Sequence, residues 1–382
     1  MDYVFWASLG LVIYIYIGYP LVIDLLARLL RRSHDRSVIL PRVSILIAAY
    51  NEEQDIEATL RNKVAQDYPR DRLEVLVVSD ESTDATDSIV EAFAATADVP
   101  VRLFRQYPRR GKTAGLNMLA GHATGEILVF SDANSLYSTD AVRKLVQNFA
   151  DADVGYVTGK MVYTSPDGSL VGDGCSSYMK YENWLRERET RIGSVVGVDG
   201  GVDAMRSALY QKLSADQLPD FVQPLKVVEQ GKRVIYEPGA LLKEAALESA
   251  GHEYPMRVRV SLRAMWAMHD LRILFNPFRY GLYSFQFLSH KLLRYLAFVP
   301  VILVFVSNLL LLGQGVVYQV LMAGQILFYL LAATGHILAG RAGSPAVIAL
   351  PYYFTLLNVA CLHAAWRYIR GEKQVIWKPR TG

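Results

Sequence analysis

Two apolar regions, one near each end of the chain, constrain its fold more than any other feature. Residues Phe5–Leu26 form an almost uncharged run, and a helix of about 20 such residues crosses the roughly 30 Å hydrocarbon core of a bilayer. We predict a retained membrane anchor and not a cleaved signal peptide, because no basic residue precedes the run and no small-residue cleavage site closes it. Apolar sequence resumes near Tyr283, and we predict three further spans: Tyr295–Leu312, Val316–Leu338 and Ala346–Ala365.

Basic residues beside these spans predict which side of the membrane each segment occupies. Five arginines follow the first span: Arg28, Arg31, Arg32, Arg36 and Arg42. By the positive-inside rule they predict an outside N-terminus and a cytoplasmic domain, in a multi-pass protein of the plasma or inner membrane. Three later spans would then leave the C-terminus outside, although its basic residues favour the cytoplasm: Arg367, Arg370, Lys373, Lys378 and Arg380. Either one span is re-entrant or interfacial, or the charge bias of the anchor prevails.

Composition excludes several classes of protein. Of the 382 residues, 52% are hydrophobic and only 20% are charged, an apolar excess that fits lipid-facing segments. The net charge of +3 excludes a polybasic nucleic-acid binder and an acidic disordered chain. Two cysteines, Cys175 and Cys361, are too few for a disulfide framework or a zinc site.

Residues 41–253 carry the pattern of a doubly wound α/β domain. Short runs rich in Val, Ile and Leu are typical of buried parallel strands, and they are Val43–Ala49, Leu73–Ser79, Val101–Gln106 and Glu126–Ser131. Helical patterns separate them, at Glu53–Gln66, Asp84–Ala97 and Thr113–Gly121. We predict a Rossmann-like sheet that binds ligands at the carboxyl ends of its strands. We predict that the rest of the chain, outside residues 41–253, divides into three parts. They are an anchor and basic linker (1–40), amphipathic interface helices (254–294) and a C-terminal membrane region with a basic tail (295–382).

Polar residues follow all four strands, where such a sheet binds its ligands. The clusters are Tyr50-Asn51-Glu52-Glu53, the run Ser79–Thr86, Arg109-Arg110-Gly111-Lys112-Thr113 and Ser131-Asp132-Ala133-Asn134. One such cluster alone is often a turn or a helix cap, but four at one edge of a sheet predict a binding site. A Walker-type phosphate loop is excluded, because that motif needs glycine at position 106, where Gln106 stands.

In this order the motifs resemble those of family 2 glycosyltransferases, the membrane-anchored GT-A group that includes cellulose, chitin and hyaluronan synthases. The matching motifs are Tyr50–Glu53, Asp80, Gly111-Lys112, Asp132–Asn134, Asp199–Arg206, Leu218–Asp220 and Arg233–Pro238. The resemblance covers Pro41 to about Asn276. It implies a GT-A fold and an enzyme that transfers a sugar from a nucleotide-sugar donor.

The resemblance also implies which residues bind the donor. Tyr50 and Glu52 would border the base, Asp80 would bond the uracil or ribose, and Lys112 would pair with the uracil oxygen or a phosphate.

A divalent metal is implied at Asp132 and Asn134, which occupy a motif that is usually Asp-x-Asp in this family. Mg²⁺ or Mn²⁺ on these oxygens would neutralise the leaving diphosphate. The Asn134 amide oxygen brings less charge than the usual carboxylate, and a helix cap is the structural alternative for this residue.

Asp220 is the predicted general base, since an inverting transfer needs a carboxylate to take the proton of the acceptor hydroxyl. The family has an acid pair here, whereas Pro219 precedes Asp220. Asp216 is the competing candidate, and a plain helix-start aspartate is the structural alternative. Asp203 and Arg206 are predicted to contact the acceptor, with a simple tight turn as the alternative.

The segment Met256–Phe275 predicts a basic amphipathic helix suited to an anionic membrane face. By resemblance, Arg259 and Arg263 bind either the donor phosphates or lipid head groups, and Trp266 lies beneath the acceptor sugar. Their spacing does not match the Gln/Arg-x-x-Arg-Trp motif of the family's polymerases, which weakens the case for processive synthesis. Residues Tyr178–Arg191 predict a charged surface helix.

Together these features predict a membrane-bound inverting glycosyltransferase that moves a sugar from a UDP-sugar to a growing β-linked polysaccharide. Transfer of one sugar to a lipid acceptor, either a polyprenyl phosphate or diacylglycerol, is the enzymatic alternative. A membrane-tethered nucleotide-binding regulator is the non-enzymatic one. Four spans form a narrow set, so the polymer channel is either formed by this chain alone or completed by a membrane partner subunit.

Overall fold

The computed structural model describes residues 1–164, 174–245, 253–338 and 345–374. The chain divides into two compact units, which are described separately. Among the described residues, a helical unit contains 1–25, 174–177, 253–338 and 345–373, and a sheet unit contains 26–164, 178–245 and 374.

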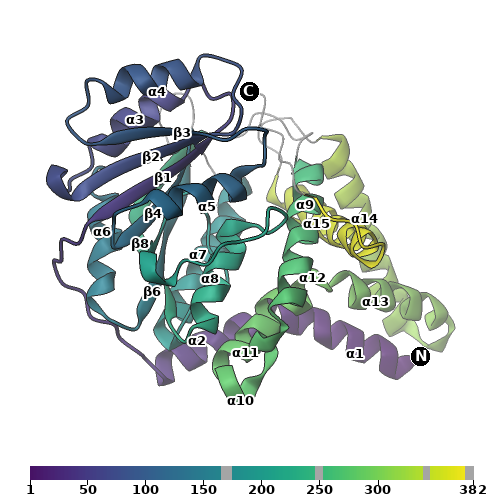
Figure 1. Ribbon diagram of the computed structural model, residues 1–382. Coiled ribbons are helices and arrows are strands. Elements are labelled where there is room, and N and C mark those ends of the chain that lie inside the picture. The colour runs from purple at the N-terminus through teal and green to yellow at the C-terminus, as the bar shows by residue number, and fades with distance from the viewer. Residues whose placement is uncertain (165–173, 246–252, 339–344, 375–382) are drawn as a thin grey trace. The chain divides into compact units, whose positions relative to one another are not determined.

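The sheet unit is built on one eight-stranded sheet with the order β3-β2-β1-β4-β7-β6-β8-β5 (Figure 1). The strands are β1 (Val43–Ala49), β2 (Leu73–Ser79), β3 (Val101–Arg105), β4 (Ile127–Asp132), β5 (Leu136–Tyr137), β6 (Val154–Thr164), β7 (Asp203–Arg206) and β8 (Arg233–Ala245). The first four are parallel, and β7 runs antiparallel to both β4 and β6. The GT-A-type α/β sheet predicted from the sequence is confirmed.

The register of the parallel strands brings their polar ends together. Ala49 at the end of β1 pairs with Ser79 at the end of β2, and Ala48 pairs with Asp132 at the end of β4. The predicted strand-end clusters therefore lie at one edge of the sheet, as parallel pairing requires.

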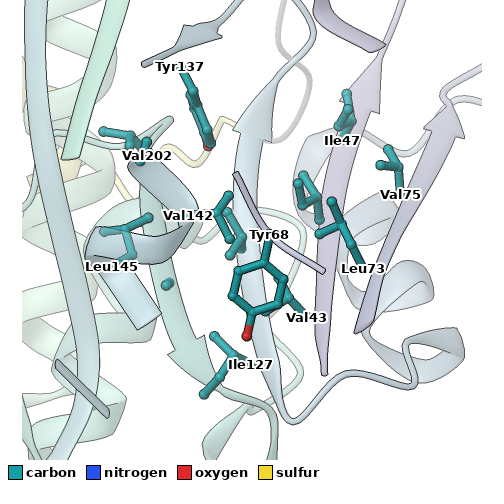
Figure 2. Close-up of a cluster of buried hydrophobic side chains, with 14 of the residues drawn as sticks. Val43, Ile47, Tyr68, Leu73, Val75, Ile127, Tyr137, Val142, Leu145 and Val202 are labelled. Atoms are coloured by element: carbon teal, nitrogen blue, oxygen red, sulfur yellow. The ribbon is translucent and has the colours of Figure 1, made fainter. Parts of the chain in front are cut away.

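Helices cover both faces of the parallel strands. Alternate side chains of β1 and β2, such as Val43 and Val75, pack with residues of α3 (Ile56–Val64), α4 (Thr86–Ala94) and α6 (Ala141–Val146) in one apolar core (Figure 2). Helix α5 (Lys112–His122) also packs against β1 and β2. A Cβ atom at Gly115 would lie 2.7 Å from Val78 Cγ1, so only glycine lets α5 approach this closely.

Helix α7 (Gly174–Ile192) differs from its prediction. We predicted a charged surface helix over Tyr178–Arg191, and this is wrong. Three of its charged residues are buried: Glu182, Arg186 and Glu189. Arg186 pairs with Asp199, and Glu189 accepts a hydrogen bond from the Val196 N–H.

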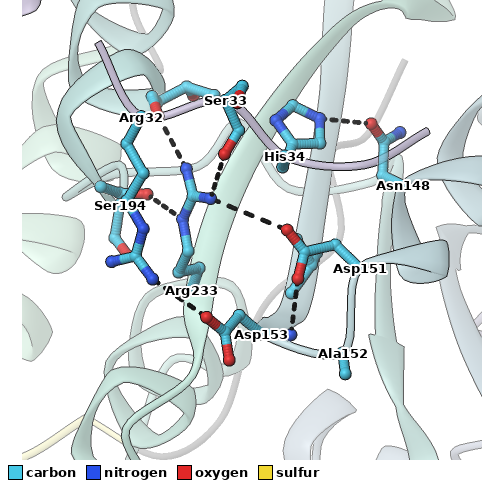
Figure 3. A network of polar contacts seen from close by, with 12 residues as sticks. Arg32, Ser33, His34, Asn148, Asp151, Ala152, Asp153, Ser194 and Arg233 are labelled. Carbon is cyan, nitrogen blue, oxygen red and sulfur yellow. Dashed lines mark hydrogen bonds and ion pairs between the residues drawn. The ribbon is translucent and has the colours of Figure 1, made fainter.

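The basic linker after the first helix is held against the sheet unit. Arg32 pairs with Asp153 at 3.0 Å, and the Arg233 guanidinium donates to the Ser33 carbonyl at 3.2 Å (Figure 3). Arg36 pairs with the buried carboxylate of Glu237. Two of the five arginines that predict topology therefore also anchor this segment to the fold.

The helical unit contains the apolar helices. A continuous helical stretch, Asp2–Leu29, comprises α1 (Asp2–Ile13), the π-helix η1 (Tyr14–Gly18) and α2 (Tyr19–Leu29). Together with α14 (Val316–Ile337) and α15 (Ala346–Ile369), it is long and apolar enough to cross a membrane, which makes three candidate spans among the described residues. The predicted straight span Tyr295–Leu312 is instead the second half of a helix pair, Leu282–Tyr295 and Phe298–Leu310, bent by 57°. Counted as one span, this pair gives a fourth.

The remaining helical elements complete the two units. They are α8 (Pro219–Glu229), α9 (Glu253–Asp270), α10 (Pro277–Tyr280), α11 (Leu282–Gln286), η7 (Phe287–Leu292), α12 (Leu293–Tyr295), α13 (Phe298–Leu310) and the short η2 (Arg70–Arg72), η3 (Gln147–Ala150), η4 (Ser207–Leu209), η6 (Arg272–Phe275) and η8 (Leu312–Gln314).

Candidate active site

The loops after β1 and β2 are joined by reciprocal hydrogen bonds. The Asn51 amide N–H donates to Ser82 Oγ at 3.1 Å, and the Thr83 N–H donates to Asn51 Oδ1 at 2.8 Å. The Glu53 N–H donates to Asp84 Oδ2 at 3.1 Å. These polar residues turn two separate strand ends into one fixed rim.

Asp80 organises the loop that follows β3. Its Oδ1 accepts from the Arg110 N–H at 2.8 Å, and its Oδ2 accepts from the Gly111 N–H at 2.9 Å. The Gln106 amide also donates to this carboxylate, which is 5% exposed. Asp80 therefore fixes the segment that leads into Lys112, in addition to any contact with a donor.

Tyr50 and Glu52 border the same rim. The Arg109 guanidinium carbon lies 3.4 Å from the centre of the Tyr50 ring, a cation–π arrangement that presents a flat aromatic and guanidinium surface. Burial, together with the nearby carboxylates of Asp55 and Asp132, raises the pKa of Glu52 to about 7.

Lys112 at the start of α5 forms an ion pair with Asp132 at the end of β4. Burial alone would lower the pKa of Lys112, but the carboxylates of Asp132 and Asp220 outweigh that effect and raise it. Lys112 is therefore a permanent cation in a partly exposed position, where its side chain is 35% exposed. Asn134 lies two residues after Asp132 in an exposed turn.

The buried side chain of Lys63 holds the turn that follows Asp132. Lys63 Nζ donates to the Ser135 carbonyl at 2.5 Å and to Asn62 Oδ1 at 3.0 Å, and it lies 3.6 Å from the centre of the Tyr137 ring. The Tyr137 hydroxyl donates to the carbonyls of Phe130 and Gly201. The metal-motif turn is thus tied both to α3 and to the loop before β7.

The Gly200-Gly201 pair lies between the predicted metal ligand and the predicted base. A Cβ atom at Gly200 would lie 2.8 Å from Asp220 Oδ2, and one at Gly201 would lie 3.6 Å from Asp132 Oδ2. Both residues have positive φ angles, +77° and +76°, which favour glycine. The diglycine loop is therefore the point where the Asp132 and Asp220 carboxylates converge.

A small pocket opens beside this loop. Its volume is about 20 Å³, enough for one water molecule. The side chains that line it come from β4, α5, β6, β7, α8 and neighbouring loops, and they include Lys112, Tyr156, Asp203, Tyr210, Asp220 and Gln223.

Asp203 is the most buried carboxylate of the pocket, with 1% of its surface exposed. Burial raises its pKa to about 7, although hydrogen bonds from Thr158 and Tyr156 favour the charged form. The nearby Asp220 carboxylate adds to the upward shift. The structure thus brings Asp203 and Asp220 together in one pocket, with Lys112 on its wall.

A buried ion pair holds the diglycine loop from the side of α7. Arg186 pairs with Asp199 at 2.6 Å, and the two side chains are 6% and 4% exposed. The Arg186 Nε–H donates to the Gly197 carbonyl at 3.0 Å, and Asp199 Oδ2 accepts from the Met161 N–H at 3.3 Å. Arg186 therefore fixes the residue that immediately precedes Gly200.

Arg206 does not share the pocket in this structure. Its guanidinium donates to the backbone carbonyls of Val154, Phe149 and Asp151, at 2.7 to 2.9 Å. These contacts tie β7 to the segment around β6 and give Arg206 a structural role, while its contact with an acceptor stays a prediction.

The three candidates on α9 belong to the helical unit and are described apart from the pocket. Arg263 is buried, so it is not on an exposed basic face as the amphipathic prediction required. The Trp266 indole donates to the Glu372 carbonyl at 2.9 Å and packs on Tyr368. Arg259 is half-buried.

Sequence reasoning missed five residues of the site: Lys63, Tyr156, Arg186, Tyr210 and Gln223. Four of them belong to no motif, and their positions depend on contacts between distant segments. Gln223 had a usable signal, because it follows Asp220 by three residues on α8 and therefore lies on the same helix face.

Comparison with known proteins supports the geometry. The family model described as Glycosyl transferase family 2 matches residues 44–205. "Probable glycosyltransferase YdaM" of Bacillus subtilis (strain 168) is 38% identical over 221 residues, which are 55% of this chain and 52% of that protein.

Two further relatives carry more specific names. A Beta-monoglucosyldiacylglycerol synthase of Nostoc sp. is 28% identical over 44% of this chain and 36% of that protein. A Poly-beta-1,6-N-acetyl-D-glucosamine synthase of Staphylococcus aureus (strain COL) is 24% identical over 64% of this chain and 60% of that protein. The chain thus spans between about a third and three fifths of the length of these curated relatives.

One solved structure is similar along almost the whole chain. The mannosyltransferase PcManGT from Pyrobaculum calidifontis, in complex with GDP-Man and Mn²⁺, superposes with a TM-score of 0.73 and 25% sequence identity, and the match covers 97% of this chain and 99% of that one. Residues 44–205, which contain Asp80, Lys112, Asp132 and the diglycine loop, therefore form a glycosyltransferase family 2 domain, and the similarity to the solved structure shows that it has the GT-A fold.

Proposed function

We propose that this protein is a membrane-bound, metal-dependent inverting glycosyltransferase that moves a sugar from a UDP-sugar to the end of a growing β-linked polysaccharide. The observation that carries the proposal is that two carboxylates approach the Gly200-Gly201 pair. Asp220 approaches Gly200, and Asp132, which is paired with Lys112, approaches Gly201. A leaving diphosphate needs cations, and an attacking hydroxyl needs a base, so the two carboxylates have separate roles.

The donor half of the site fits a nucleoside diphosphate. Tyr50 with its Arg109 partner offers a stacking surface for the base, and Lys112 offers a cation for the diphosphate. Asp80 and Glu52 complete the rim, and Asp80 acts through the loop that it holds.

The oxygen ligands present fit Mg²⁺ or Mn²⁺ that is shared with the substrate. Among the described residues no group of three or more His, Cys, Asp or Glu side chains could hold a metal by itself. Mg²⁺ in phosphoryl-binding sites is commonly held by one or two carboxylates together with substrate phosphates. Asp132 and Asn134 would supply the protein's oxygens, and the bound ion would neutralise charge on the leaving diphosphate. Lys112 would then be released from Asp132 to face a phosphate.

Asp220 is proposed to take the proton of the acceptor hydroxyl as its oxygen attacks the anomeric carbon, which inverts the configuration. Its Oδ1 is buried and has no hydrogen-bond partner among the described residues, so a lone pair is available to an incoming hydroxyl. Asp216 stays the competing candidate, but it does not line the pocket.

A polysaccharide acceptor is supported by the similarity to a Poly-beta-1,6-N-acetyl-D-glucosamine synthase, and a lipid acceptor by the similarity to a Beta-monoglucosyldiacylglycerol synthase. The candidate spans fit either product, since both involve the bilayer. We place the enzyme in the plasma or inner membrane with its sheet unit in the cytoplasm, where nucleotide sugars are available, and with a partner subunit as one route to a complete channel.

The test is turnover by the full chain in nanodiscs. Labelled UDP-glucose, UDP-N-acetylglucosamine, UDP-glucuronate and GDP-mannose are each supplied with Mg²⁺, Mn²⁺ or EDTA, and the labelled product is sized. A high-molecular-weight product that is lost with EDTA supports the proposal, and a small product extracted by organic solvent supports the lipid alternative. Asp220→Asn should abolish transfer and keep donor binding, Asp132→Ala should weaken metal-dependent donor binding, and Asp216→Asn should change neither. Turnover retained in Asp220→Asn would remove it as the base.

A further inference from the structure

The pocket beside the diglycine loop contains an unusual set of polar atoms. Three buried oxygens on its lining side chains accept no hydrogen bond within the described part of the chain: Asp203 Oδ1, Asp220 Oδ1 and Gln223 Oε1. Buried polar atoms are almost always hydrogen-bonded in folded proteins, so three unpaired oxygens on side chains that line one small pocket indicate that a ligand supplies the donors.

The neighbouring donors are already committed elsewhere. The Tyr210 hydroxyl lies beside Gln223 but donates to Asn117 Oδ1 at 2.9 Å. The Gln223 amide nitrogen donates to the Gln211 carbonyl at 2.6 Å, which fixes the orientation of the amide, and the Gln223 side chain lines the pocket. The Gln223 oxygen is therefore held in place as an acceptor.

The chemistry of the lining selects the group that enters. A neutral hydroxyl brings a proton to these acceptor oxygens, and a hydroxyl oxygen has about the size of the water molecule that the pocket accommodates. A phosphate monoester carries a charge of about −1.5 to −2 at neutral pH and offers mainly acceptor oxygens. Placed between Asp203 and Asp220, it would meet like charge, and the cation on the wall of the pocket, Lys112, is already paired with Asp132.

We propose that Asp203 and Gln223, together with Asp220, form a hydroxyl-binding pocket that selects a neutral alcohol, such as a sugar hydroxyl, as the acceptor and excludes a phosphate ester. The inference rests on the proposed function and names the acceptor class of that same site. Asp203 on β7 supplies in space the second acid that the sequence lacks beside Asp220, where Pro219 stands. Asp220 receives the proton, and Asp203 and Gln223 hold the hydroxyl that loses it.

The first test compares two acceptors with the same tail. The full chain in nanodiscs receives each nucleotide sugar with a panel of octyl β-glycosides or with octyl phosphate, and release of nucleotide and labelling of the octyl compound are both measured. We expect at least one glycoside to be labelled and octyl phosphate to be labelled at least a hundredfold more slowly. Labelling of octyl phosphate at a comparable rate would overturn the inference.

The second test uses a matched pair of glutamines on and just after α8. Gln223 and Gln230 each donate an amide hydrogen bond to a backbone carbonyl of the preceding segment, Gln211 and Leu209 respectively. Only Gln223 lines the pocket. Gln223→Met should raise the KM for the glycoside about tenfold or more and leave the KM for the donor unchanged, whereas Gln230→Met should change neither. Asp203→Asn, which keeps the side-chain shape, should also raise the glycoside KM.

Hydrolysis of the donor without any acceptor gives a further readout, because water is then the hydroxyl in the pocket. Gln223→Met and Asp203→Asn should hydrolyse the donor at least tenfold more slowly than Gln230→Met. Equal hydrolysis rates, or equal glycoside KM values, in all three variants refute the inference while wild-type transfer still supports the proposed function. A wild-type protein that neither transfers nor hydrolyses any nucleotide sugar refutes the proposed function, and the inference with it.

Discussion

Gly200 offers a direct way to move Asp220 without changing it. Gly200 has φ +77°, and a Cβ atom added there would lie 2.8 Å from Asp220 Oδ2, inside the 3.4 Å at which ordinary contacts begin. The obstructing atom is the end of a side chain, so Gly200→Ala can be accommodated if the carboxylate turns away. A displacement of several tenths of an ångström is enough to misplace a base, since a misplacement of about 1 Å can cost about a hundredfold in rate.

Gly231 is the matched control for the backbone strain that alanine causes at a positive φ angle. It has the same φ of +77° just after α8, but a Cβ atom there meets nothing within 4 Å. An L-residue in this conformation costs about 1–2 kcal/mol at either position. We therefore expect Gly200→Ala and Gly231→Ala to lower the melting temperature by similar amounts, while kcat falls about ten- to hundredfold only in Gly200→Ala.

The assay is nucleotide release from the donor by detergent-purified variants, with donor KM and melting temperature measured on the same samples. A change confined to kcat, with donor binding preserved, is the signature of a displaced base. If both variants lose activity in proportion to their loss of folded protein, or if Gly200→Ala keeps full kcat, then the contact between Gly200 and Asp220 does not position the catalytic carboxylate.

Three further predictions concern the scaffold of the site. The pKa of Asp203 is raised to about 7, so the folded protein binds a proton at this carboxyl group more tightly than the unfolded chain does. The free energy of unfolding should therefore fall as the pH rises from about 4 to about 7, by at most about 4 kcal/mol. Asp203→Asn should flatten the melting temperature across that pH window, and an unchanged slope would contradict the raised pKa. Arg186→Leu leaves Asp199 buried without its partner and should destabilise by about 3–5 kcal/mol, with much of the loss recovered in the double variant Arg186→Leu/Asp199→Leu; a double-mutant cycle without coupling would contradict this. On α5, Gly115→Ala should lower the free energy of unfolding by about 1–3 kcal/mol, because the added methyl group overpacks the contact with β2. Gly121→Ala, whose Cβ meets open space, should raise the free energy of unfolding by up to about 1 kcal/mol. Equal melting temperatures of the two variants would show that α5 moves freely.

Strands β1, β2 and β4 could be predicted from sequence because they are largely buried on both faces. Val43–Ala49 and Leu73–Ser79 were predicted to the residue, and the next two strands differ by one residue at their ends. In a parallel sheet covered by helices, a strand reads as a continuous apolar run, so its limits are visible locally. The polar residues after each run then follow from the rule that ligands bind at the carboxyl edge.

The acceptor half could not be predicted in the same way, because its parts meet only through tertiary contacts. Arg186 belongs to a helix that reads as charged and exposed, and its burial depends on Asp199, which lies in another segment. Tyr156 and Asp203 come from β6 and β7, whose antiparallel pairing was not predicted. Asp203 was predicted as an acceptor contact only through the family resemblance, and nothing in the local sequence around Tyr156 indicates that it lines a pocket with Asp220.

This division has a consequence for how far family membership determines the reaction. The family match ends at residue 205, so it contains the donor half and stops before α8, which carries Asp220 and Gln223. Proteins named for different products, a monoglucosyldiacylglycerol in one case and a poly-N-acetylglucosamine in the other, are similar to this chain over 169 and 257 residues respectively. The donor rim meets the pocket at Gly200-Gly201, which Asp132 and Asp220 approach, and at Lys112, which pairs with Asp132 and lines the pocket. Residues on α8 and β7 can therefore change the acceptor without disturbing the donor rim, and the acceptor of this enzyme has to be inferred from the oxygens that line the pocket.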